Sequence, residues 1–162
     1  MPAAILFVCL GNICRSPLAE AAFRRAAEEA GLDVLADSAG TGDWHVGRPP
    51  DRRAQAVALR HGIDISSYRA RQVERADFHR FDWIFALDAD NLATLRLLAP
   101  DGGRARLSLL LDMVPGREGE AVVDPYFGDE AGFDLSWADV SAAADALVAR
   151  LLGADPRDRD VR

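Results

Sequence analysis

Two patterns of apolar and polar positions alternate along this chain of 162 residues. Short apolar runs typical of buried strands lie at residues 4–9, 33–38, 83–87 and 107–113. Between them, apolar positions recur every three or four residues, which predicts helices at 17–30, 51–61, 91–98 and 134–152, and a short helix at 73–79. Because strands that alternate with helices form βαβ units, the pattern predicts an α/β fold: a parallel sheet with helices on both faces.

The pattern predicts a single domain. With 49% hydrophobic and 28% charged residues the chain has enough apolar material for one core, and no repeat or linker divides it. We expect residues 1–154 to form the domain. Residues 155–162 mix charges without apolar periodicity and are expected to be a flexible tail. The segment 115–133 is expected to be a long irregular loop, and such loops are often functional.

Charge and cysteine content exclude several classes of protein. A net charge of −7 without any basic stripe argues against binding to nucleic acid or to anionic membranes. No apolar run approaches the roughly 20 residues of a membrane span, and the first residues lack the charged region of a signal peptide. Two cysteines are too few for a disulfide framework. We therefore expect a cytoplasmic protein, with export by a route that needs no signal peptide left open.

The strongest chemical signal follows the first strand. Cys9 ends that strand, a short loop follows, and Ser16-Pro17 opens a helix. A loop between a strand end and a helix N-terminus aims backbone N–H groups and the helix dipole at one point, which binds a tetrahedral oxyanion. The same field favours a thiolate, so Cys9 is the predicted nucleophile. The residues expected to line this phosphate cradle are Leu10, Gly11, Asn12, Ile13 and Cys14.

The residues around this loop have predicted roles of their own. Arg15 is expected to clamp two phosphoryl oxygens through its planar fork. Ser16 suits a helix N-cap and equally a hydrogen-bond donor to the Cys9 sulfur, so both interpretations stay open. Gly11 is expected to turn the backbone with positive φ. Asn12 tolerates the same conformation, and its amide is able to tie the loop to its neighbours.

Cys14 permits two interpretations. It lies five positions after Cys9, so a bent loop is able to bring the two sulfurs together. A reversible disulfide there would switch the protein off and protect the nucleophile from irreversible oxidation. A small apolar filler is the other interpretation, and the sequence leaves both open.

Asp124 is the candidate proton donor for a leaving group. Two valines precede it and a proline follows, which predicts a carboxyl group at the edge of an apolar pocket. Asp129 is the local rival, and a plain turn is the commoner meaning of Asp-Pro. Ligands of open α/β sheets bind beyond the carboxyl ends of the strands, so Ser38 and Asp88 are expected to join the 115–133 segment at the rim of the site and to support the loop.

Aromatic residues predict the shape of the substrate. Trp44 lies in a glycine-rich loop, where core anchors are rare, and with Tyr126 it is able to wall a slot for a flat aromatic group. The three histidines, His45, His61 and His79, show no metal-ligand spacing and are interpreted as solvated or satisfied side chains. We therefore expect neither a metal nor a cofactor.

These motifs together resemble the low-molecular-weight protein tyrosine phosphatase family. The family patterns V-C-x-G-N-x-C-R-S-P, S-A-G-T-x-x-W-H-x-G, R-A-R-Q, D-x-x-N-L and D-P-Y are met in order at residues 8–17, 38–47, 69–72, 88–92 and 124–126. The resemblance implies a flavodoxin-like three-layer sandwich with a four-stranded parallel sheet. It implies a phosphocysteine intermediate with Cys9 as nucleophile, Arg15 as clamp and Asp124 as acid. Phosphotyrosine-containing proteins would be the substrates and inorganic phosphate the product, with Asn12 and Ser38 in the network that shapes the loop.

Two positions depart from the family pattern. Tyr68 stands where the family often has a histidine that joins the loop-shaping network, so that network is expected either to be rewired through the phenol or to give the thiolate a different pKa. Tyr126-Phe127 replaces the frequent tyrosine pair after Asp-Pro, which excludes regulation by phosphorylation of a second tyrosine.

Three alternatives keep the same scaffold. An arsenate reductase would relay a disulfide through further cysteines, and the chain has only Cys9 and Cys14. An arginine phosphatase is disfavoured because relatives of that kind tend to carry threonine where Ile13 stands. A non-catalytic module that binds phosphoproteins or senses oxidants would not need an acid such as Asp124.

Overall fold

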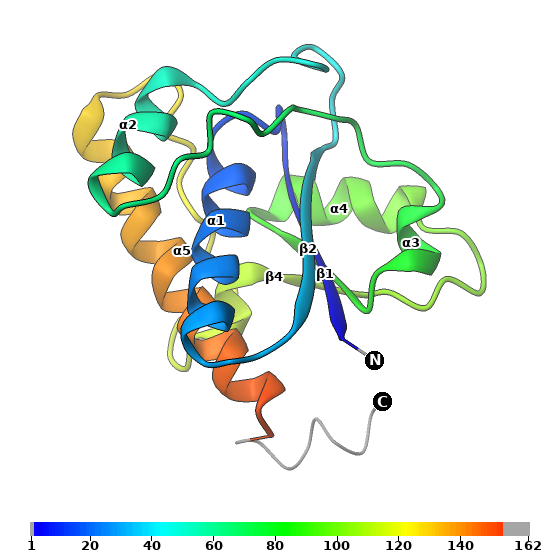
Figure 1. Ribbon diagram of the computed structural model, residues 1–162. Coiled ribbons are helices and arrows are strands. Elements are labelled where there is room, and N and C mark those ends of the chain that lie inside the picture. Colours follow the sequence, from blue (N-terminus) through cyan, green and yellow to red (C-terminus); the bar gives the residue numbers. More distant parts are fainter. Residues whose placement is uncertain (1, 154–162) are drawn as a thin grey trace.

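A four-stranded parallel sheet forms the centre of the computed structural model, which describes residues 2–153 (Figure 1). Its strands have the order β2-β1-β3-β4, and each adjacent pair is parallel. The strands are β1 (Ala3–Cys9), β2 (Val34–Gly40), β3 (Trp83–Ala86) and β4 (Arg106–Leu109). The helices are α1 (Arg15–Glu29), α2 (Arg52–Arg60), α3 (Asp77–Arg80), α4 (Ala89–Leu98), α5 (Glu130–Leu151) and the 3₁₀ helix η1 (Leu110–Met113). The predicted α/β class is confirmed.

Helices cover both faces of the sheet and make three layers. Figure 1 shows α1, α2 and α5 on one face and α3 and α4 on the other. Strand β1 serves both layers because successive side chains point to opposite faces. Ile5 and Phe7 belong to the cluster under α1 and α5, whereas Leu6 and Val8 belong to the cluster under α4. A strand buried on both sides must be apolar throughout, which explains the unbroken run that predicted it.

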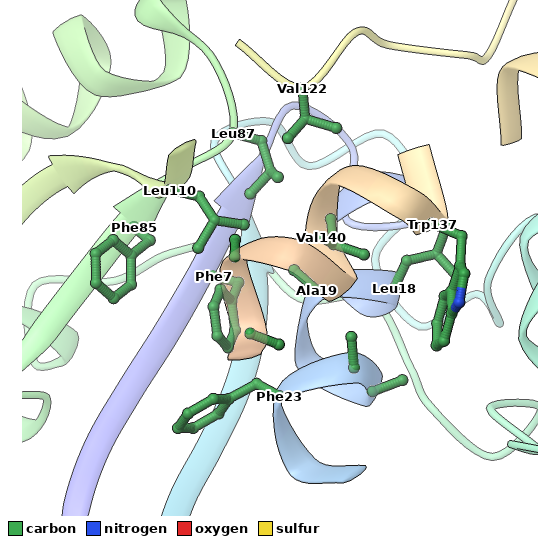
Figure 2. Packing of buried hydrophobic residues seen from close by; sticks show 14 of the residues in the cluster. Phe7, Leu18, Ala19, Phe23, Phe85, Leu87, Leu110, Val122, Trp137 and Val140 are labelled. Carbon is green, nitrogen blue, oxygen red and sulfur yellow. The ribbon is translucent and has the colours of Figure 1, made fainter. Parts of the chain in front are cut away.

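The larger core cluster also anchors the loop that follows η1. Figure 2 shows this cluster, in which Phe7 of β1 meets Phe23 of α1 with ring centroids 5.7 Å apart. Trp137 of α5 lies at the edge of this cluster. Val122, from the irregular segment, is fully buried there and donates its N–H to the Leu87 carbonyl at 2.9 Å. This anchor places the residues that follow Val122 over the carboxyl ends of the strands.

Several predicted boundaries were wrong for identifiable reasons. The run at 107–113 is strand only to Leu109, after which the backbone tightens into η1. The last helix begins at Glu130, before the predicted residue 134, because the Asp129 side chain accepts a hydrogen bond from Gly132 N–H and caps it. The helix predicted at 73–79 is only Asp77–Arg80, since the N–H of Val73 bonds the carbonyl of Gly40.

Two further points concern the extent of the chain. The tail predicted at 155–162 lies outside the described residues, so the domain boundary at residue 154 stays a prediction. Among the helices in residues 2–153, none is long and apolar enough to cross a membrane.

Candidate active site

One residue of the loop between β1 and α1 has an unusual backbone conformation. Asn12 has φ of 58°, and within residues 2–153 it is the one non-glycine residue with positive φ. The expectation that Gly11 would take this conformation was wrong. Gly11 instead leaves room for a neighbour, because a Cβ there would lie 3.0 Å from Cδ2 of His45. The turn at Asn12 brings its N–H to within 3.3 Å of the Cys9 sulfur.

The side chain of Asn12 ties the loop to three other segments. Its amide donates to Ser16 Oγ at 2.8 Å and to Ser38 Oγ at 2.9 Å, and its Oδ1 accepts from Arg71 N–H at 2.9 Å. The two bonds to the serines are buried and the bond from Arg71 is partly buried. Each net hydrogen bond contributes about 1 kcal/mol, so together they offset the cost of a left-handed backbone. The predicted tie between Asn12 and its neighbours is confirmed, and Ser38 lies in the network as expected.

The Ser16 hydroxyl contacts the Cys9 sulfur and does not cap the helix. Helix α1 begins at Arg15 with Cys14 at the N-cap position, and no side chain caps it. The hydroxyl of Ser16 is 3.0 Å from the Cys9 sulfur. This oxygen accepts a hydrogen bond from the Asn12 amide, and its own hydrogen has two acceptors within reach, the Cys9 sulfur and, at 3.4 Å, the Ala39 carbonyl. If Cys9 is a thiolate it has no proton to give, and the hydroxyl of Ser16 is then the donor in this contact.

Arg15 is buried and its guanidinium is fixed in place. Nη1 donates to Asp88 Oδ2 and to the Val122 carbonyl, both at 2.8 Å. Asp88 also caps α4 by accepting the N–H of Asn91 at 2.8 Å. A cation in the first turn of a helix is opposed by the helix dipole, and the ion pair with Asp88 offsets that cost. Asp88 therefore supports the site from the end of β3, on the predicted rim.

A pocket of about 140 Å³ opens above the loop. Its floor carries the polar groups of the loop, and its rim carries aromatic rings, of which Trp44 is 69% exposed and Phe127 95% exposed. The predicted residues that line it are Cys9, Leu10, Gly11, Ile13, Cys14, Arg15, Trp44, Asp124 and Tyr126. Asn12 was also predicted to line it, but it lines a separate cavity instead. A polar floor with an aromatic mouth fits an anionic group attached to a ring.

The pocket also includes two residues, His45 and Phe127, that were not assigned to a site from the sequence. His45 lies beside Gly11, and its ring centroid is 6.4 Å from that of Tyr126. Phe127 meets the Tyr126 ring edge-on at 4.9 Å. Their chain positions next to Trp44 and Tyr126 were the available signal. Within residues 2–153, no group of three or more histidine, cysteine or acidic side chains could hold a metal ion.

Asp124 has a side chain that is 43% exposed and lies at the same pocket as Cys9. Its Oδ2 is 3.6 Å from Arg15 Nη2, and its Oδ1 accepts the N–H of Tyr126 at 3.1 Å. Asp129 instead caps α5 and is absent from the pocket lining. The placement favours Asp124 over Asp129 as the acid.

Cys14 is a buried free cysteine in the same pocket as Cys9, which is also free. Burial raises the pKa of the Cys14 thiol far above its ordinary range, and the nearby charge of Asp51 raises it further. Cys14 is therefore a protonated thiol, which suits the small filler interpretation. The alternative of a reversible disulfide with Cys9 stays a prediction.

A buried carboxyl group ends the hydrogen-bond network behind the loop. Ser38 Oγ donates to Glu20 Oε1 at 2.9 Å, and Glu20 Oε2 accepts from Arg24 Nε at 2.8 Å. Tyr68 lines a cavity of about 210 Å³ with these three residues. Burial raises the pKa of Tyr68 to about 12, with the charge of Glu20 adding to the effect. The network of Asn12 and Ser38 thus continues through Glu20 to Arg24, and the Tyr68 phenol stays protonated near Glu20. Rewiring of this network through the phenol stays a prediction.

Glu20→Gln is expected to make stability less dependent on pH. Burial raises the pKa of Glu20 above its ordinary 4.5, although bonds from Arg24 and Ser38 oppose that rise. The folded chain therefore binds this proton more tightly than the unfolded chain. The resulting stability is complete below pH 4.5 and is lost as pH rises through the folded pKa. As pH rises through the folded pKa of Glu20, the melting temperature of the variant should therefore increase relative to that of the wild type.

Glu28→Gln is the matched control, because Glu28 is an exposed residue of the same helix. The control should follow the wild type at every pH. A difference between Glu20→Gln and wild type that stays constant with pH would contradict the prediction.

Comparison with known proteins assigns this chain to a family. The family model described as "Low molecular weight phosphotyrosine protein phosphatase" matches residues 4–156. The chain belongs to this family. A low molecular weight phosphotyrosine protein phosphatase of Schizosaccharomyces pombe is 46% identical over 132 residues, which is 80% of this chain and 84% of the relative.

Solved structures of phosphatases share the fold. The crystal structure of YfkJ from Bacillus subtilis superposes with a TM-score of 0.88 at 39% identity, and the match covers 96% of this chain and 98% of that one. The structure titled drosophila arginine phosphatase also gives a TM-score of 0.88, at 32% identity over 93% of this chain and 99% of that one.

Proposed function

We propose that this chain hydrolyses phosphotyrosine in proteins with Cys9 as nucleophile, Arg15 as phosphate clamp and Asp124 as general acid and base. The class of enzyme follows from the family: the chain is a low molecular weight protein-tyrosine phosphatase, a hydrolase of phosphate monoesters. One observation carries the assignment of residues. A thiol, a fixed guanidinium and a carboxyl group line a single pocket at the carboxyl end of β1.

The first step transfers the phosphoryl group to sulfur. The Cys9 thiolate attacks phosphorus, the S–P bond forms, and the P–O bond to the tyrosine ring breaks. Asp124 gives its proton to the departing phenolic oxygen. Loop N–H groups and the Arg15 fork bind the equatorial oxygens, whose charge is spread in the transition state. The clamp works without reorganisation because its Nη1 is already bound to Asp88 and Val122.

The second step returns the enzyme to its starting state. Water attacks the phosphocysteine, and Asp124, now a carboxylate, takes the proton from that water. The S–P bond breaks, inorganic phosphate leaves, and Cys9 is again a thiolate. Ser16 stabilises this leaving sulfur by donating a hydrogen bond to it across 3.0 Å.

The aromatic rim supports an aryl ester as the substrate. Trp44 and Tyr126 stand at the pocket mouth, where a phosphotyrosine ring would lie between the floor and solvent. Phosphotyrosine-containing proteins are thus the proposed partners. A reducing compartment such as the cytoplasm is the proposed location, because the mechanism needs Cys9 as a free thiol, as it is in the structure.

Rates on four substrates under reducing conditions test this function. We expect hydrolysis of a phosphotyrosine peptide and of p-nitrophenyl phosphate, with slow turnover of a phosphoarginine peptide and of arsenate. The likeness to an arginine phosphatase makes the phosphoarginine peptide the critical comparison. Preference for it would replace the proposed substrate, and thiol-dependent turnover of arsenate would indicate a reductase. Binding of phosphate without turnover of any substrate would indicate a non-catalytic module.

A further inference from the structure

Arg53, near the start of α2, reaches the segment that carries Asp124. We infer that Arg53 is a positioning residue that holds the general acid over the phosphate loop, although it does not line the catalytic pocket. This inference rests on the proposed role of Asp124.

Arg53 binds the chain segment that follows Asp124. Its Nη2 donates to the Tyr126 carbonyl at 2.9 Å, and its Nη1 donates to the Gly128 carbonyl at 3.1 Å. The guanidinium also lies 4.7 Å from the ring centroid of Phe133 and 5.8 Å from that of Tyr126. Tyr126 itself gives its N–H to Asp124 Oδ1 at 3.1 Å. Tyr126 thus accepts a hydrogen bond from Arg53 through its carbonyl and donates one to the Asp124 carboxyl group through its N–H.

Arg53 is also linked to the phosphate loop, through Asp51. Asp51 binds the guanidinium through both oxygens, with Nε to Oδ1 and Nη2 to Oδ2 each at 3.0 Å. The N–H of Asp51 in turn donates to the Ile13 carbonyl at 2.8 Å. A continuous path therefore runs from the loop that holds phosphate, through Asp51 and Arg53, to the segment that holds the acid.

Few other contacts hold the segment that carries Asp124. Its segment lacks helix or strand between Met113 and Glu130, and its side chain is 43% exposed. The buried side chain of Val122 and a hydrogen bond of 3.3 Å from Ser136 Oγ to the Val123 carbonyl fix the chain just before Asp124. Arg53 fixes it just after, where the N–H of Gly128 and the carbonyl of Pro125 close a turn at 2.9 Å. Loss of Arg53 would free one end of the piece that carries the acid.

The chemistry of arginine suits this task. A planar fork with five donors can bind a carboxylate and two carbonyl groups at once, which a lysine ammonium cannot imitate in the same geometry. A small displacement of a catalytic group is costly, since misplacement by about 1 Å can lower a rate by roughly 10²-fold. The effect of Arg53 should therefore appear only where the proton from Asp124 is needed.

The test measures kcat/KM for two aryl phosphates that differ in leaving group. Arg53→Met should lower kcat/KM for phenyl phosphate by roughly tenfold more than for p-nitrophenyl phosphate, whose leaving group needs less help from an acid. Arg53→Lys should recover part of the loss. Arg52→Met is the matched control, because Arg52 is an exposed arginine of the same helical turn, and it should leave both values unchanged. Adding Arg53→Met to Asp124→Ala should cause no further leaving-group effect.

The outcomes separate this inference from the function on which it rests. Equal losses on both esters in Arg53→Met, with a lowered melting temperature, would overturn the inference and leave Arg53 as a purely structural residue. Leaving-group dependence in Asp124→Ala but none in Arg53→Met would also overturn it, with the acid assignment intact. Absence of leaving-group dependence in Asp124→Ala itself would remove both proposals together.

Discussion

Cys9→Ser is expected to abolish hydrolysis while the pocket continues to bind phosphate. A serine hydroxyl is a far weaker nucleophile than a thiolate, and the field of the loop cannot ionise it at neutral pH. Loss of a catalytic nucleophile lowers kcat by roughly 10⁴-fold or more. The groups that bind phosphate, the loop N–H groups and Arg15, are unchanged. Initial rates on p-nitrophenyl phosphate and calorimetric titration with inorganic phosphate measure the two properties separately.

Cys14→Ser supplies the comparison for this experiment, because it removes the second sulfur of the same pocket. We expect it to retain far more turnover than Cys9→Ser, since a buried, protonated Cys14 is not the attacking group. Ordinary turnover in Cys9→Ser would sink the assignment of the nucleophile. Loss of turnover in both variants together with loss of phosphate binding would instead point to collapse of the loop.

The fold could be predicted to the level of its layers because burial on both faces of the sheet leaves unbroken apolar runs. The boundary error near β4 shows the limit of that signal. Leu110, Leu111 and Met113 are buried as the pattern indicated, but they pack in the cluster under α1 and α5 and continue no strand. Apolar runs report burial, and they do not report which hydrogen-bond pattern satisfies the backbone.

The candidate site was predictable where its chemistry is local. Cys9, Ser16 and Arg15 fall within one loop and the first turn of a helix, and topology alone brings Asp124 to the same rim. Arg53 was not predictable, because it meets its acceptors across more than seventy residues and an arginine near the start of a helix carries no signal.

The backbone of the phosphate loop shows a second kind of limit. A loop that needs positive φ favours glycine on general grounds, which is why Gly11 was preferred. Asn12 takes that conformation because three hydrogen bonds of its side chain hold it there. Two of those partners, Ser38 and Arg71, are distant in the sequence, so the deciding interactions are invisible to a local pattern.

Asp124→Ala is expected to slow the cleavage of poor leaving groups much more than that of activated ones. General acid catalysis contributes roughly 10²–10⁴-fold when the leaving oxygen needs a proton in the transition state. We expect a loss of this size in kcat/KM for phenyl phosphate and a clearly smaller one for p-nitrophenyl phosphate. A series of substituted phenyl phosphates measures the effect as a steeper dependence of kcat/KM on the basicity of the leaving group.

Asp129→Ala makes this test decisive, because it removes the rival carboxylate from the same segment. Asp129 caps α5, so its loss should lower the free energy of unfolding by about 1 kcal/mol without changing the leaving-group dependence. If Asp124→Ala lost equally on all esters while Asp129→Ala became sensitive to the leaving group, the acid would be Asp129. The 3.6 Å between Asp124 and Arg15 argues for the opposite result, since it places this carboxyl group at the pocket in which we propose that the phosphoryl group binds.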